Sequence, residues 1–118
     1  MMYEEYRRAL MFFEARQYTE AARLLAPLLE AEPGNRSLVE LQARAYFHSA
    51  QLGRAEGALN RLLELAPDDG WAREALARTL ERAGRPGEAR VHRRLAGALG
   101  VAPAEGTEAV VTAANLVS

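Results

Sequence analysis

Apolar residues recur every three or four positions along most of this chain. This spacing places them on one face of an α-helix. The pattern covers six stretches, at residues 3–15, 18–31, 37–49, 52–65, 71–83 and 86–99. It therefore predicts an all-α chain of six helices.

Proline and glycine mark the breaks between these helices. Pro33–Gly34–Asn35 closes the second helix, and Pro67–Asp68–Asp69–Gly70 closes the fourth. Proline cannot continue a helix, whereas glycine and asparagine accept turn dihedrals. The breaks within each pair of helices are only a few residues long, so the two helices of a pair must lie antiparallel.

A period of 34 residues relates the three helix pairs. Small residues recur in phase, at Ala9, Ala43 and Ala77 and again at Ala21, Ala55 and Ala89. Bulky apolar residues recur at Phe12, Tyr46 and Leu80, and prolines at Pro33 and Pro67. The period predicts three tandem copies of one helix pair, at residues 2–35, 36–69 and 70–103. Small residues allow close approach of the helices, and large residues fill the space beside them.

These residues resemble the tetratricopeptide repeat over about residues 2–103. The resemblance implies a right-handed α-solenoid of three helix-turn-helix units, a fold that usually binds other proteins. The third unit departs from the pattern, because Arg93 stands where the first two units have Leu25 and Leu59. We therefore expect the last helix pair to be looser or more exposed. The tryptophan typical of the family is also replaced, by Glu5, Val39 and Arg73.

The C-terminal residues 104–118 need a separate interpretation. Thr107 is a suitable N-cap for a helix at about 108–116. Its apolar stripe would consist of Ala109, Val110, Ala113, Ala114 and Val117. We favour a short capping helix over the third unit. The alternatives are a frayed terminus or a tail that occupies its own or a neighbour's groove.

Composition excludes several classes of function. The net charge of −1 and a pI near 6.1 offer no general attraction to nucleic acid or to anionic membranes. The absence of cysteine excludes disulfides and thiolate chemistry. No apolar run approaches the roughly 20 residues that cross a bilayer, and the N-terminus does not resemble a signal peptide. We expect a cytoplasmic protein.

In the tetratricopeptide repeat family, the inner wall of the solenoid is formed by one face of each first helix. The matching positions here predict a peptide groove lined by Tyr3, Tyr6, Leu10, Phe13, Glu40, Arg44, Phe47, His48, Trp71, Glu74, Arg78 and Arg82. Aromatic side chains anchor interfaces more often than most others do. We therefore predict that Tyr3, Tyr6, Phe13 and Phe47 receive an apolar peptide or helix. They are alternatively ordinary core residues, or they pair with a second copy of the chain.

Charged residues allow two interpretations. Glu40–Arg44 and Glu74–Arg78 either bind acidic groups of a partner or form i,i+4 pairs within their helices, and we favour the second. The family's basic clamp for a terminal carboxylate is missing, because Tyr6 and Leu10 occupy its positions. Further arginines lie close together on the last helix, at Arg85, Arg90, Arg93 and Arg94. Their positive charges are suited to bind an acidic surface of another protein.

No sequence motif points to catalysis. The two histidines, His48 and His92, stand outside any metal-binding motif, and no phosphate loop or nucleophile elbow is present. We expect no enzyme activity, cofactor or metal. The predicted function is a protein-binding adaptor or scaffold that holds a partner segment in its groove. The alternatives are a structural homodimer and, more narrowly, a secretion-type chaperone.

Overall fold

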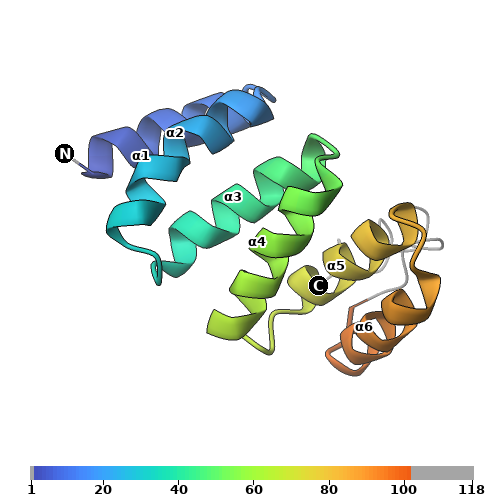
Figure 1. Ribbon diagram of the computed structural model, residues 1–118. Coiled ribbons are helices and arrows are strands. Elements are labelled where there is room, and N and C mark those ends of the chain that lie inside the picture. Colours follow the sequence, from blue (N-terminus) through green and yellow to red (C-terminus); the bar gives the residue numbers. More distant parts are fainter. Residues whose placement is uncertain (1, 102–118) are drawn as a thin grey trace, which may run out of the picture. The chain divides into compact units, whose positions relative to one another are not determined.

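A computed structural model describes residues 2–101 of the chain, and all regular secondary structure in that range is α-helical. The expected all-α helical repeat is confirmed. The six helices are α1 (Met2–Glu14), α2 (Tyr18–Ala31), α3 (Arg36–His48), α4 (Leu52–Leu65), α5 (Gly70–Arg82) and α6 (Pro86–Ala98), as Figure 1 shows. The helix predicted at 108–116 lies outside the described residues.

The chain divides into two compact units between Pro67 and Asp68. In the first unit α1 packs on α2, α2 on α3 and α3 on α4, while α1 also meets α3 (Figure 1). In the second unit α5 packs on α6. The division into repeats at residues 35 and 69 remains a prediction.

The helix ends repeat one local geometry in each pair. Arg16, Ala50 and Gly84 have positive φ angles of 64°, 58° and 80°, and each follows the first helix of its pair. The next N–H reaches back to the helix, as in Gln17 N to Phe12 O at 2.8 Å. This is the usual left-handed termination of a helix, which satisfies its last carbonyl groups.

Side-chain caps also recur with the repeat. The Asn35 side chain accepts hydrogen bonds from the Ser37 and Leu38 N–H groups, at 3.0 and 3.3 Å. Asp69 accepts one from the Ala72 N–H at 3.0 Å. Each cap satisfies donors that the first helical turn leaves open. These caps fix where the first helices of the second and third pairs begin.

The recurring alanines lie at the centre of the packing. Their exposed fractions are 0 or 1%, for Ala9, Ala21, Ala43, Ala55, Ala77 and Ala89. Leu25, Leu59 and Leu62 are completely buried in the first unit. The bulky Phe12 and Tyr46, which we expected to fill the same core, are only half-buried. Their outer edges therefore remain open to solvent.

Candidate functional site

Two tyrosines of α1 and the start of α3 form an open pocket in the first unit. It has a volume of about 380 Å³ and is lined by Met2, Tyr3, Tyr6, Asn35, Ser37 and Leu38. Leu38 is only 2% exposed, whereas Tyr3 is 70% exposed and has the Arg7 guanidinium 5.9 Å from its ring centre. The pocket therefore combines a buried apolar floor with an accessible aromatic rim.

A cluster of four rings lies where α1 and α3 end. The His48 ring stacks on Tyr18 at 5.1 Å and meets the edges of Phe47 and Phe13 at 5.6 and 5.9 Å. Phe13 and Tyr18 also meet edge to face, at 5.2 Å. All four side chains keep part of their surface exposed. The cluster is thus both packed and accessible, as interface anchors usually are.

The part of the predicted face between the pocket and the ring cluster holds Leu10, Glu40 and Arg44. Helical spacing puts Leu10 on the same stripe of α1 as Tyr6 and Phe13. On α3, Arg44 donates hydrogen bonds to Glu40 at 3.0 and 3.2 Å, which agrees with the i,i+4 pairing that we favoured. Leu10 and both charged residues are half-buried. The first unit therefore presents apolar ends and a charge-paired middle.

In the second unit, the residues predicted to line the groove have different surroundings from those in the first unit. Glu74 is only 9% exposed, and its carboxylate forms an ion pair with Arg93 of α6 at 3.1 Å. Trp71 and Arg78 are half-buried, and Arg82 is exposed at the end of α5. Because Glu74 is directed towards α6, we leave it out of the binding face proposed below.

Both histidines lie in surroundings that favour the neutral imidazole. Partial burial, assisted by the Arg44 charge, lowers the pKa of His48. Burial and the Arg73 charge likewise lower the pKa of His92, with Glu88 acting in the opposite direction. The Arg73 guanidinium lies 3.2 Å from His92 Nδ1, so a neutral His92 is able to accept its hydrogen bond.

These pKa shifts predict a loss of stability in mild acid. Since both folded-state values lie below the ordinary 6.5, the unfolded chain takes up protons first as the pH falls. The urea midpoint is expected to fall between about pH 7.5 and about pH 5.5, and to fall less in His48→Gln/His92→Gln. An equal fall in the double variant would contradict this explanation.

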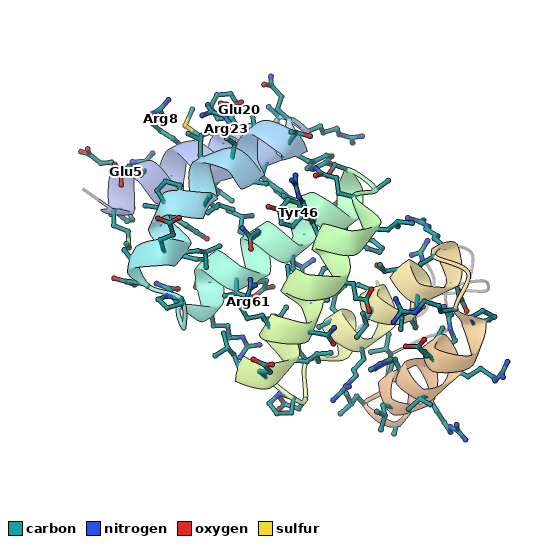
Figure 2. All side chains as sticks on the ribbon, viewed as in Figure 1. Glu5, Arg8, Glu20, Arg23, Tyr46 and Arg61 are labelled. Carbon is teal, nitrogen blue, oxygen red and sulfur yellow. The ribbon has the colours of Figure 1, made fainter. Side chains whose placement is uncertain are left out.

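The outer side of α1 and α2 carries charges of both signs. Figure 2 labels Glu5, Arg8, Glu20 and Arg23 along this edge of the molecule. Arg23 donates hydrogen bonds to the Glu20 carboxylate, and this contact lowers the pKa of Glu20. Desolvation acts in the opposite direction, and the charges of Arg23 and Arg8 add to the lowering. Such exposed pairs contribute little stability, so this edge is a solvated surface.

Sequence reasoning missed several residues that belong to the two ends of the face. Tyr18 starts α2 and does not occupy a groove position of the repeat, yet it stacks on His48. The sequence feature that could have identified Tyr18 was its position directly after the short turn that follows α1. Met2, Asn35 and Leu38 complete the pocket beside Tyr6, and none of the three had been assigned a role in binding, because they precede or underlie the predicted stripe.

The comparison with protein families decides the identity of the fold. The tetratricopeptide repeat profile matches residues 12–78, more than half of the chain. This chain belongs to the tetratricopeptide repeat family. Such proteins are generally interaction or scaffold modules rather than enzymes, and this chain is an interaction or scaffold module of that kind. A search of curated proteins found no match.

Solved structures of the tetratricopeptide repeat protein MamA are similar to this chain. MamA MSR-1 is 26% identical, with a TM-score of 0.72, over 77% of this chain and 52% of that one. A MamA point mutant is 26% identical, with a TM-score of 0.76, over 83% and 72%. MamA from Desulfovibrio magneticus RS-1, from residue 41 onward, is 22% identical over 80% and 54%, with a TM-score of 0.73. The similarity to this last protein, at 22% identity, shows a shared fold only. This chain spans about half the length of MamA MSR-1.

Two features are absent from the described repeat helices. In residues 2–101 no helix is both long and apolar enough to cross a bilayer. The same residues contain no group of three or more histidine, aspartate or glutamate side chains placed to hold a metal ion.

Proposed function

We propose that this chain binds an apolar segment of a partner protein along the α1–α3 face of its first unit. The observation that carries the proposal is the open pocket beside Tyr6, with Leu38 as its buried floor. A hydrophobic side chain placed there would cover the exposed Tyr3 ring. Burial of apolar area on both partners is the main source of affinity in such interfaces.

The ring cluster at the other end supplies a second anchor. Phe13 and Phe47 retain accessible surface while packing against His48. A peptide that spans both ends would pass over Leu10 and the Glu40–Arg44 pair. The ion pair leaves the middle of the face with little net charge, which favours an apolar rather than a highly charged segment.

A self-associating scaffold is the second candidate. It is favoured by the exposure of large apolar side chains on α1, where Tyr3 is 70% and Met11 62% exposed. A second copy of the chain would bury them in a symmetric interface. Light scattering at micromolar concentration separates the two candidates, because binding to a different protein requires no dimer.

The test is selection of peptides from a displayed random library, followed by titration of the selected peptides. Tyr6→Ala/Phe13→Ala is expected to weaken their binding by at least about 30-fold, since an anchor residue contributes about 2 kcal/mol or more. The matched control is Met11→Ala/Leu65→Ala, which removes exposed apolar side chains elsewhere. Equal binding by the native chain and a folded Tyr6→Ala/Phe13→Ala variant would exclude this face.

A further inference from the structure

A second pocket of the first unit lies among α2, α3 and α4. Its volume is about 470 Å³, and its walls include Leu29, Gln42, Tyr46, Arg54, Gly57 and Arg61. It shares no lining residue with the pocket beside Tyr6. Figure 2 labels Tyr46 on α3 and Arg61 on α4. We call it the Arg54–Arg61 pocket.

The two arginines bring positive charge to this pocket, and their hydrogen-bond partners among residues 2–101 are neutral amides. Arg54 donates to the neutral amide of Gln51 at 3.1 Å, and Arg61 to that of Gln42 at 3.5 Å. Within the described residues neither guanidinium forms an ion pair, whereas Arg44 of the same unit pairs with Glu40. A guanidinium hydrogen-bonded to a neutral amide keeps its charge available for an anion.

Gly57 leaves the space between the arginines open. It lies three residues after Arg54 and four before Arg61, on the same face of α4, so the three positions extend over about 10 Å. A Cβ added at Gly57 would meet no atom within 4 Å. Its φ is not positive and a helix interior disfavours glycine, so local backbone geometry does not require it. Because Gly57 has no side chain, an apolar recess remains beside the buried Leu29.

The polar groups of the pocket complement a peptide. Gln42 is 7% exposed and its amide oxygen accepts from Arg61, which leaves its amide nitrogen as a further donor. Glu30 is the one acidic side chain that lines the pocket. Its carboxylate is suited to accept a peptide N–H, which an inorganic anion lacks. The charges of Arg54, Arg61 and Glu30 sum to +1.

We infer that the Arg54–Arg61 pocket binds a partner segment in which an acidic side chain stands beside an apolar one. The carboxylate meets Arg61, Arg54 or both, and the apolar side chain enters the recess at Gly57. Phosphate is a poorer occupant, because it has no apolar group to enter the recess beside Leu29 and no N–H group to donate to the Glu30 carboxylate. This site is separate from the α1–α3 face and goes beyond the function proposed above.

The test is an NMR titration of the isotope-labelled full chain with acetyl-leucyl-glutamyl-leucinamide. The Gly57 amide is expected to shift and saturate. The glutaminyl peptide, identical in shape but neutral, is expected to bind at least about tenfold more weakly, because charged hydrogen bonds are about twice as strong as neutral ones. Equal binding of both peptides would overturn the proposal. Displacement by an equal concentration of inorganic phosphate would also overturn it.

Two variants locate the site. Gly57→Leu fills the recess and Arg61→Met removes the charge while keeping much of the side-chain length, so each is expected to reduce binding at least tenfold. Gly53→Leu is the matched control, because a Cβ there also meets nothing within 4 Å but Gly53 does not line the pocket. Unchanged binding in a folded Gly57→Leu or Arg61→Met chain would reject the assignment. Tyr6→Ala/Phe13→Ala is expected to bind this peptide normally, which separates a failure here from a failure of the α1–α3 face.

Discussion

The Arg93→Ala variant is expected to destabilise the α5–α6 pair by about 3 kcal/mol, the lower end for a buried ion pair that loses one member. Arg93 of α6 reaches Glu74 at 3.1 Å and Glu81 at 2.9 Å. The Glu74 side chain is 12% and the Arg93 side chain 22% exposed, so water screens this contact only in part. Without Arg93 the Glu74 carboxylate stays largely buried and loses that compensating charge.

Urea unfolding monitored by the fluorescence of Trp71 measures this effect. Trp71 is the sole tryptophan of the sequence and lies on α5, within the unit that the change affects. Arg94→Ala, an exposed neighbour on the same helix, is the control and is expected to change stability by less than about 0.5 kcal/mol. Glu74→Leu/Arg93→Leu is expected to be neutral or more stable, since it removes both charges. Equal effects of Arg93→Ala and Arg94→Ala would contradict the pairing.

The Leu59→Ala variant is expected to destabilise the first unit by about 2–5 kcal/mol, the usual effect of truncating a fully buried leucine. Leu59 lies on α4 with an exposed fraction of 0%, in a unit where α4 packs on α3. Truncation removes apolar contacts and leaves a cavity that the close-packed helices fill only in part.

Urea unfolding followed by circular dichroism provides the measurement for Leu59. Leu65→Ala is the matched control, because Leu65 ends the same helix with 40% exposure. We expect its effect to be within about 0.5 kcal/mol, as for most surface changes. A Leu59→Ala chain as stable as Leu65→Ala would place Leu59 outside the core.

Most of the fold was predictable from local signals. Apolar spacing and the breaks at proline and glycine placed every described helix within one residue of its observed bounds. The 34-residue period identified the alanines that prove to be fully buried, including Ala43 and Ala77. These signals depend only on neighbouring residues or on the 34-residue repeat, so they can be read directly from the sequence.

The contacts between helices were harder to predict. Arg93 suggested a looser or more exposed last pair, and of the residues of α6 only Ala89 and Ala96 are buried. The spacing did not predict that Arg93 reaches two glutamates of α5. Tyr18 joined the ring cluster from outside the predicted stripe. Such contacts depend on side-chain rotamers and on how two helices cross, which sequence spacing does not determine. The groove assignment of Tyr6, Phe13 and Phe47 remains a prediction for the same reason.

The most direct test of the central claim maps a bound peptide on the chain itself. A peptide selected by the native chain is titrated into the isotope-labelled protein, and amide shifts are followed by NMR. We predict the largest shifts at Tyr6, Leu10 and Phe13 of α1 and at Phe47 of α3. Saturable shifts confined to α2, α4 or the second unit would contradict binding on the α1–α3 face.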